Sequence, residues 1–273
     1  MLEFKEKRIK AVNYIQDRVD IEPKIGLILG SGLGDYSEQL ESKTKIKYDD
    51  IPGMPVSTVE GHAGELVFGE KHGKKVVAMN GRVHFYEGYS MKEIVFPIWV
   101  MKELGIEKLI ITNAAGGLNS TFRPGDLMII TDHLNFMGTN PLIGQNDEEI
   151  GPRFPAMTDA HPEHLIELAE EAAQNADLHI MKGVYLAITG PVYETYAMSN
   201  FQKLIGADAV GMSTVPELIA GTHAGLENLA ISCITDVVKG KEEESLTHEE
   251  VMEVAQKVKP KFKNLVNNII KEL

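Results

Sequence analysis

Short apolar runs alternate with helical patterns along nearly the whole chain, and this alternation restricts the possible folds more than any other feature. The apolar runs cover residues 25–29, 65–68, 76–79, 109–111, 127–130, 184–188, 209–210 and 229–234. Helical patterns cover residues 9–19, 90–104, 162–175, 195–204, 215–224 and 247–271. Strands that alternate with helices indicate an α/β fold whose largely parallel sheet is buried between helices.

One local pattern predicts that the sheet also has an antiparallel part. The runs at 65–68 and 76–79 flank His72 and Gly73, a spacing typical of a hairpin. No low-complexity linker and no repeat of fixed period divides the 273 residues. We therefore expect one domain over residues 1–273, an α/β fold with a mixed, largely parallel sheet flanked by helices. The segment 132–160 has no regular pattern, and irregular segments of that length are usually functional or packed against a partner.

Charge and cysteine content exclude several kinds of function. The chain has 40 Asp and Glu against 27 Lys and Arg, a formal net charge of −13, which disfavours a nucleic-acid partner. Cys233 is the single cysteine, so one chain can form neither a disulfide nor a multi-cysteine metal site. The charged N-terminal residues are not followed by a long apolar stretch. We therefore expect no signal peptide, no membrane partner and a cytoplasmic location.

A glycine loop, residues 30–34 with the sequence Gly-Ser-Gly-Leu-Gly, follows the apolar run at 25–29. Glycines allow backbone N–H groups to approach an anion closely, so the loop predicts a phosphate site. A dinucleotide fingerprint needs G-x-G-x-x-G and an acidic residue about 20 positions later. Here the third glycine comes one residue early and Asp35 follows at once, which weakens the case for a dinucleotide-binding fold.

Three other familiar motifs fail by small margins. Residues 69–74 are one residue short of a P-loop and are better explained by the hairpin turn. Ser31 lacks the flanking glycine of a nucleophile elbow. His161 and His164 lie three residues apart near a helix start, but without the HExxH pattern they do not predict a metal site. We expect no bound metal.

Residues 82–87 carry the first group of side chains suited to binding a ligand. In an extended segment Arg82, His84 and Tyr86 point to one side, where a guanidinium and an imidazole can hold a tetrahedral oxyanion. Glu87 can hydrogen-bond the His84 imidazole and set its tautomer. The alternative is a surface ion pair between Arg82 and Glu87.

Three further junctions follow predicted strands. Residues 112–117 are small and permit close contact with a ligand, residues 190–195 present an aromatic beside a carboxylate, and residues 211–217 lead through Ser and Thr into a helix with Pro in its first turn. Each segment alone has a plain structural explanation as packing or as a helix N-cap. Together they gather at the carboxyl ends of sheet strands, where α/β proteins bind ligands.

Taken together, these segments resemble the trimeric-type purine nucleoside phosphorylases over essentially the whole chain. The resemblance rests on seven ordered blocks, at residues 30–34, 61–64, 81–88, 112–117, 153–157, 190–195 and 211–217. It implies reversible phosphorolysis of a purine ribo- or deoxyribonucleoside to the free base and pentose 1-phosphate. Orthophosphate is then a co-substrate, and neither a metal nor an organic cofactor is needed.

The resemblance also implies roles for individual residues of this sequence. Orthophosphate is expected against Ser31, His62, Arg82, His84, Ala114 and Ser213; the sugar against Tyr86, Met212 and His248; the base against Tyr193, Glu194 and Asp236; Asn113 belongs to the same substrate-binding set. The expected catalytic residues are His84, Glu87 and Asp236. Members of the family are commonly homotrimers in which an aromatic residue closes the neighbouring subunit's sugar site, and Phe154 matches that position.

One position departs from the family pattern. Asp236 stands where relatives that prefer 6-oxopurines usually carry Asn. Glu194, a hydrogen-bond acceptor when ionised, matches N1–H of hypoxanthine and guanine. An ionised Asp236 favours a 6-amino group, whereas a protonated Asp236 can donate to N7. We expect inosine and guanosine as the main substrates, with some activity on adenosine.

Other functions remain open at this point. The methylthioadenosine phosphorylases share the fold but usually differ in the glycine loop and at residues 113–117. A non-catalytic nucleoside-binding protein on the same fold and an NAD-dependent dehydrogenase are the remaining alternatives. The glycine spacing disfavours the dehydrogenase.

Overall fold

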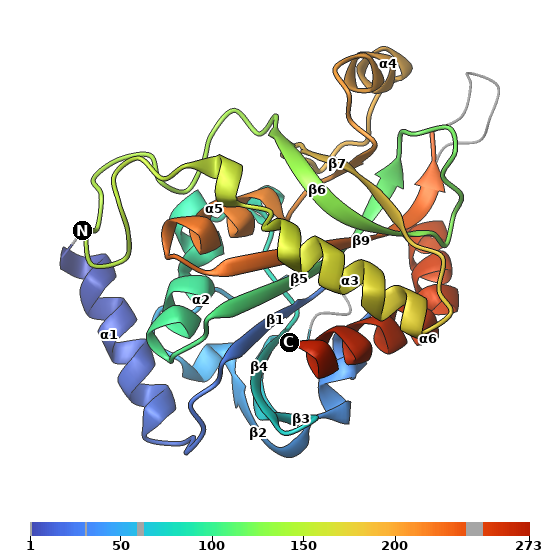
Figure 1. The fold of residues 1–273 in the computed structure, drawn as a ribbon. Coiled ribbons are helices and arrows are strands. Elements are labelled where there is room, and N and C mark those ends of the chain that lie inside the picture. The colour runs from blue at the N-terminus through green and yellow to red at the C-terminus, as the bar shows by residue number, and fades with distance from the viewer. Residues whose placement is uncertain (1, 31, 59–62, 239–247) are drawn as a thin grey trace.

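Strand β1 (Ile25–Leu29) lies inside a nine-stranded sheet, and all five of its residues are buried. It pairs in parallel with β4 (Lys74–Asn80) on one side and with β5 (Lys108–Gly117) on the other. The computed structural model describes residues 2–30, 32–58, 63–238 and 248–273, and Figure 1 shows their arrangement.

The strand order is β2-β3-β4-β1-β5-β8-β7-β6-β9, and β9 also pairs with β5. The last five strands in this order therefore close into a ring. The remaining strands are β2 (Glu41–Lys47), β3 (Glu65–Lys71), β6 (Leu127–Asn135), β7 (Met181–Ala187), β8 (Ala209–Gly211) and β9 (Glu227–Val237). Parallel pairings join β1–β4, β1–β5, β5–β9, β6–β7 and β7–β8; antiparallel pairings join β2–β3, β3–β4, β5–β8 and β6–β9. This mixed sheet, flanked by helices in a single α/β domain, confirms the predicted fold class.

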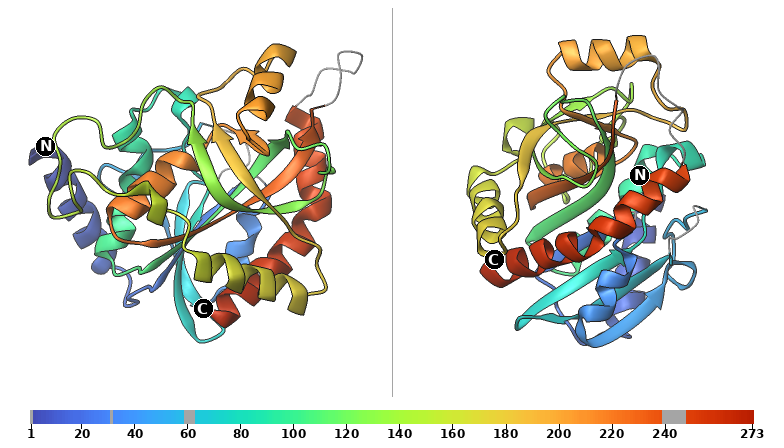
Figure 2. Two further views of the ribbon diagram at one scale, coloured as in Figure 1. Left: turned by 45° about the horizontal axis from the view of Figure 1, so that its top comes forward. Right: turned by 90° about the vertical axis from the view of Figure 1, so that its right-hand side faces the viewer.

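Helices cover both faces of the sheet. One group is α1 (Leu2–Gln16), α2 (Met91–Glu103) and α5 (Val215–His223); the other is α3 (Glu163–Asn175) and α6 (His248–Glu272). Figures 1 and 2 show α3 and α6 together on one face, and α4 (Tyr196–Leu204) projecting from the rest. Among the described residues no helix has both the length and the apolar character that crossing a bilayer requires.

The side-chain alternation of β1 divides the core between these two faces. Ile28 packs into the cluster that contains α1, α2 and α5, whereas Leu27 and Leu29 pack into the cluster that contains α3 and α6. Successive residues of a strand point to opposite faces, so a strand with helices on both sides must be apolar throughout. The uninterrupted apolar run at 25–29 therefore predicted a buried central strand correctly. Cys233 is also buried, as expected for a core residue.

The structure departs from the sequence-based expectations in three places. Strand β2 was not predicted because its residues are mostly polar and exposed, as befits a strand at the end of the sheet. Residues 112–117 do not follow a strand but continue β5, since β9 pairs along their whole length. Strand β6 extends into the segment predicted to be irregular and ends at Asn135, and residues 157–159 form a 3₁₀ helix. The hairpin of β3 and β4 around His72 and Gly73 is confirmed.

Candidate functional site

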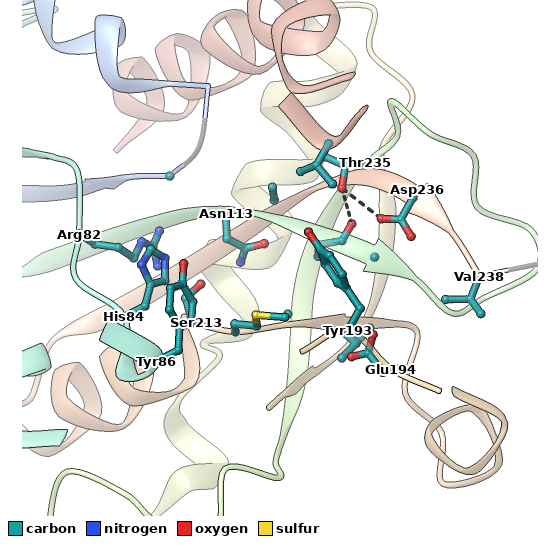
Figure 3. Close-up of a pocket in the computed structure, with 18 residues that line it drawn as sticks. Arg82, His84, Tyr86, Asn113, Tyr193, Glu194, Ser213, Thr235, Asp236 and Val238 are labelled. Atoms are coloured by element: carbon teal, nitrogen blue, oxygen red, sulfur yellow. Dashed lines mark hydrogen bonds between the residues drawn. The ribbon is translucent and has the colours of Figure 1, made fainter. Parts of the chain in front are cut away.

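A single cavity collects most of the side chains that the sequence singled out (Figure 3). Its lining comes from the segments that follow β1, β4, β7 and β8, from β5, β8 and β9 themselves, and from α6. The predicted residues that line it are Arg82, His84, Tyr86, Asn113, Ala114, Tyr193, Glu194, Met212, Ser213 and Asp236. In the view of Figure 3, Arg82 and His84 lie at one end, and Glu194 and Asp236 lie at the other.

His84 is fixed by Glu87, as the sequence predicted. His84 precedes a short 3₁₀ helix (Phe85–Glu87) that Glu87 ends. Glu87 Oε1 lies 2.9 Å from His84 Nδ1 and accepts a 2.7 Å hydrogen bond from the His84 backbone N–H. The His84 ring stacks on Tyr86, with ring centroids 4.8 Å apart and planes 10° apart. The prediction that residues 82–86 are extended is wrong for residues 85–87, which form the 3₁₀ helix. His84 and Tyr86 lie on the same side because their rings stack, and not because they alternate along a strand.

Glu87 is held as a carboxylate. Its second oxygen accepts hydrogen bonds from the Thr58 backbone N–H at 2.7 Å and from the Thr58 hydroxyl at 2.9 Å. Burial opposes the negative charge, but the hydrogen bonds from His84 and Thr58 outweigh it and lower the pKa of Glu87 to about 2. An ionised Glu87 favours the tautomer of His84 that carries its proton on Nδ1, which leaves Nε2 for a ligand.

Arg82 does not pair with Glu87, so the alternative of a surface ion pair is wrong. Its Nη1 atom donates to Glu217 Oε1 at 2.9 Å, and its Nη2 atom donates to the carbonyl of Thr112. The side chains of Arg82 and Glu217 are 3% and 4% exposed. A buried ion pair of this kind holds the guanidinium in one orientation at the floor of the cavity.

Thr214 lies in an unusual backbone turn, and its hydroxyl links Arg82 to Asn113. Its φ and ψ of 75° and −49°, together with a 2.8 Å hydrogen bond from the Val215 N–H to the Ser213 carbonyl, define a γ-turn of the rare, strained type. Its hydroxyl accepts hydrogen bonds from Asn113 at 2.9 Å and from Arg82 at 3.4 Å. Thr214 occupies the N-cap of α5 but makes no side-chain cap bond, so the N-cap explanation of this residue fails.

The glycine loop contributes close packing as well as a cavity wall. A Cβ atom at Gly30 would lie 2.5 Å from the Thr112 carbonyl oxygen and 2.8 Å from Asn113 Cα, so only glycine lets the loop rest on β5. The Gly30 N–H donates to the Thr112 hydroxyl at 2.9 Å and is thus engaged within the protein. Ser31 lies outside the described residues, as does His62.

The middle of the cavity depends on a second glycine. A Cβ atom at Gly190 would lie 2.4 Å from Met212 Sδ and 3.0 Å from Tyr86 Cδ1. Because Gly190 has no side chain, the backbone after β7 can pack directly against Met212. The residues that follow, Tyr193 and Glu194, then line the cavity. His248 begins α6, and its side chain is outside the part that the structure describes.

Two carboxylates occupy the end of the cavity opposite Arg82. Burial raises the pKa of Glu194, although its own backbone N–H and the side chain of Gln202 hydrogen-bond it and oppose the shift. Gln202 belongs to α4 and is itself 4% exposed. Helix α4 therefore positions the Glu194 carboxylate.

Asp236 lies in β9 opposite Gly116 of β5. The Thr235 hydroxyl is 3.3 Å from Asp236 Oδ1, and this contact lowers the pKa. Burial raises the pKa of Asp236 and is the largest effect, and the negative charges of Glu194 and Glu250 raise it further. The net result is a pKa of about 6. Asp236 can consequently carry a proton in slightly acidic solution and act there as a hydrogen-bond donor.

Phe154 lies apart from this group. It is 87% exposed and is not one of the described residues that line the cavity of its own chain. The neighbouring Arg153 donates to the Leu142 carbonyl at 3.0 Å, and its guanidinium carbon lies 5.5 Å from the centre of the Phe154 ring.

Sequence reasoning missed the residues that hold the site residues in place: Thr112, Gln202, Thr214 and Glu217. One signal was present, because Thr214 and Glu217 have the spacing of a capping box. In the structure both side chains bind Arg82 instead. Thr112 and Gln202 carry no comparable local signal.

Comparison with known proteins agrees with this geometry. Residues 24–271 match the family model of the phosphorylase superfamily. Purine nucleoside phosphorylase 1 of Bacillus subtilis strain 168 is 55% identical over 267 residues, which cover 98% of each chain. A schistosome purine nucleoside phosphorylase solved with hypoxanthine superimposes with a TM-score of 0.93 at 38% identity, covering 98% of this chain and 97% of the other. A Schistosoma mansoni purine nucleoside phosphorylase solved with adenosine gives 0.94 at 38% identity and the same coverage. This chain therefore belongs to the purine nucleoside phosphorylases of the phosphorylase superfamily.

Proposed function

We propose that this cavity catalyses the reversible phosphorolysis of purine nucleosides, with inosine and guanosine as the main substrates. The observation that carries the proposal is that cationic and imidazole groups suited to an anion share one cavity with two carboxylates suited to a purine. A nucleoside and orthophosphate together need both kinds of group. The reaction requires orthophosphate as co-substrate and uses no organic cofactor or metal.

At the anion end, Arg82, His84 and Ser213 hold the phosphate dianion beneath C1′ of the pentose. A phosphate oxygen forms a bond to C1′ as the bond from C1′ to N9 breaks, and the bonding electron pair leaves with the purine. The transition state has oxocarbenium character at the sugar, so a fixed anion beneath it is stabilising. No protein nucleophile is needed, and positioning is the main contribution of the enzyme. By resemblance, Ser31, His62 and the backbone of Ala114 complete this site.

Glu217 and Glu87 act through Arg82 and His84 and do not contact phosphate in this proposal. A carboxylate behind Arg82 and another behind His84 fix both donors before the substrate arrives. Such prior orientation reduces the reorganisation needed when charge develops. Tyr86, Met212 and His248 are assigned to the sugar, and Asn113 to the substrate-binding set at large.

At the base end, Glu194 accepts from N1–H, a donor that hypoxanthine and guanine carry and adenine lacks. Asp236 decides how strictly the enzyme prefers 6-oxopurines. When protonated, it donates to N7 and stabilises the negative charge that the leaving base acquires. When ionised, it accepts from a 6-amino group. A pKa of about 6 makes both forms accessible, and we therefore propose some activity on adenosine. Tyr193 packs beside the base.

We further propose that the chain works as a homotrimer in which Phe154 closes the sugar site of a neighbouring subunit. Exposed apolar side chains support association, among them Phe154 and Ile143, which are 87% and 59% exposed. Phe154 also lies away from the cavity of its own chain, which is what contribution to a neighbour requires.

A substrate panel assayed with and without orthophosphate tests the proposed function. We expect phosphate-dependent release of hypoxanthine from inosine and of guanine from guanosine, with slower release of adenine from adenosine. Turnover of methylthioadenosine in preference to inosine would favour the methylthioadenosine phosphorylases. Binding of inosine without base release in the presence of phosphate would show a non-catalytic nucleoside-binding protein, and either outcome would overturn the proposal.

A further inference from the structure

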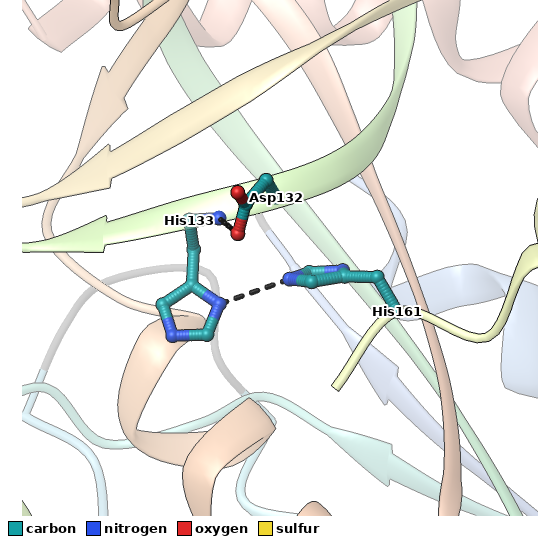
Figure 4. A group of neighbouring side chains, drawn as sticks. All are labelled: Asp132, His133 and His161. Carbon is teal, nitrogen blue, oxygen red and sulfur yellow. Dashed lines mark hydrogen bonds between the residues drawn. The ribbon is translucent and has the colours of Figure 1, made fainter. Parts of the chain in front are cut away.

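Three metal-ligating side chains meet outside the cavity described above (Figure 4). Asp132 and His133 are adjacent in β6, and His161 lies in the segment between the 3₁₀ helix at 157–159 and α3. The His133 Nδ1 and His161 Nε2 atoms are 2.9 Å apart, and one ligand atom from each of the three residues lies within 4.8 Å of the others. His161 thus pairs with His133, whereas His164 turns away and pairs with Glu227 at 2.9 Å.

The spacing of the two ring nitrogens is close to what a tetrahedral metal ion needs. Zinc bonds to histidine nitrogen at about 2.0–2.1 Å, so two such ligands stand about 3.3 Å apart. The two ring nitrogens are joined by a hydrogen bond, so the ion replaces the proton between them and moves them apart by a few tenths of an ångström. Imidazole nitrogen with a carboxylate oxygen is a ligand set that zinc and neighbouring transition metals accept.

The surroundings of the three residues favour coordination. His161 also hydrogen-bonds the backbone of Ile130. Metal-binding histidines commonly use one ring nitrogen in this way, which orients the ring and leaves the other nitrogen for the metal. Asp132 is exposed, which gives an ion a route from solvent.

We propose that Asp132, His133 and His161 form a site for one divalent transition-metal ion of the zinc type, with water in the fourth position. None of the three lines the cavity, so among the described residues the site is separate from the proposed reaction. The ion would tie β6 to the chain that enters α3. Residues 132–133 and 161 lie on either side of the irregular residues 136–156, which include Phe154. The metal would therefore hold the two ends of this irregular segment together.

The test uses untagged protein stripped with a chelator and titrated with Zn²⁺ by calorimetry, and with Co²⁺ by visible absorption. We expect one Zn²⁺ per chain, a rise in melting temperature on binding, and the intense absorption of tetrahedral Co²⁺. His161→Phe should weaken zinc binding about 100-fold or more, since even residues that only support metal ligands cost 10–100-fold when replaced. Asp132→Asn should weaken it about tenfold.

His164→Ala is the matched control, since it removes an imidazole three residues from His161 that is 59% exposed. It should bind zinc as the wild type does. Retained phosphorolysis in His161→Phe shows that this variant is folded, and the exposed Asp132→Asn provides a second variant if it is not. The proposal is overturned if wild-type protein binds no zinc, if His161→Phe and Asp132→Asn both bind it with wild-type affinity, or if His164→Ala loses as much affinity as His161→Phe.

Discussion

The Nη1 atom of Arg82 lies 2.9 Å from Oε1 of Glu217, and the two side chains are almost completely buried. The positive charge of Arg82, which is proposed to bind phosphate, is thus already balanced by the Glu217 carboxylate within the protein. The positive charge remains in place when phosphate leaves, because Glu217 compensates it.

Replacing Glu217 by Gln should therefore destabilise the free protein and increase its dependence on phosphate. Removing one partner of a buried ion pair leaves a buried charge uncompensated, and we expect a loss of about 3 kcal/mol in the free energy of unfolding. Saturating phosphate should restore more stability to Glu217→Gln than it adds to wild type, because the anion supplies the missing negative charge. Urea unfolding with and without phosphate measures both effects.

Glu227→Gln is the control for this experiment. Glu227 also forms ion pairs, but its side chain is 42% exposed, so we expect a change below about 1 kcal/mol and an unaltered response to phosphate. Equal stabilisation of Glu217→Gln and wild type by phosphate would contradict the proposed role of Arg82.

Replacing Glu87 by Gln should weaken phosphate binding through His84. The neutral Gln oxygen accepts a weaker hydrogen bond from Nδ1–H than the carboxylate does, so the ring is held less firmly. We expect KM for phosphate to rise about tenfold, the equivalent of about 1.4 kcal/mol. KM for inosine should change less. Steady-state kinetics with each substrate varied in turn gives the comparison, and an unchanged KM for phosphate would speak against the role of this pair.

The same variant should also change the pH dependence of stability. The folded protein lowers the pKa of Glu87 to about 2 from an ordinary value of 4.5, so its contribution is present above 4.5 and is lost as pH falls toward about 2. The stability advantage of wild type over Glu87→Gln should thus shrink across this interval. Urea unfolding at several pH values measures it, and a difference independent of pH would refute the assigned ionisation.

Asp236 should make the choice of purine depend on pH. Below its pKa of about 6 Asp236 is protonated and donates to a 6-oxopurine; above it the carboxylate accepts from a 6-aminopurine. The ratio of kcat/KM for inosine to that for adenosine should therefore rise as pH falls, by about tenfold across the titration of this group. The ionisation of phosphate affects both substrates and cancels in the ratio.

Asp236→Asn provides the control, since it keeps Glu194 and removes only this titration. We expect a ratio that is high at every pH, with adenosine activity below that of wild type. If Asp236→Asn leaves the wild-type ratio and its pH dependence unaltered, Asp236 does not select the base.

Replacing Phe154 by Ala should reduce activity without affecting the fold of its own chain. Loss of a side chain that becomes buried against a neighbour is worth about 1.5–3 kcal/mol, so kcat/KM for inosine should fall at least tenfold. Leu204→Ala removes an equally exposed apolar side chain from α4 and should have a smaller effect on kcat/KM. Equal kcat/KM values for Phe154→Ala and wild type would contradict a contribution of Phe154 to the site.

Local pattern was enough to predict the buried strand at 25–29 and the contact between Glu87 and His84. The run at 25–29 is apolar on both sides of the strand because helices cover both faces, and such a run is visible in the sequence. The pairing of Glu87 with His84 spans three residues and was also predictable. The polar strand β2 was not, because its pairing with β3 at one end of the sheet leaves little apolar pattern.

The partners of these residues come from distant segments and could not be predicted from spacing. Glu217 is 135 positions from Arg82, and His161 is 28 positions from His133. The continuation of β5 through residues 112–117 likewise depends on β9, which follows more than a hundred residues later. The roles proposed for Tyr193, Glu194 and Met212 rest on resemblance to a family, since each residue has an ordinary packing explanation when considered alone.

The closed ring of five strands determines how this protein can change its specificity. Asn113 and Ala114 lie in β5, Asp236 lies in β9, and the two strands are paired along the whole of β5. The proposed anion end and base end of the cavity are thus joined by paired strands, and backbone hydrogen bonds fix the span from Ala114 to Asp236. We infer that a change in nucleoside preference requires different side chains at one end of the cavity or the other, because the distance between the two ends stays the same.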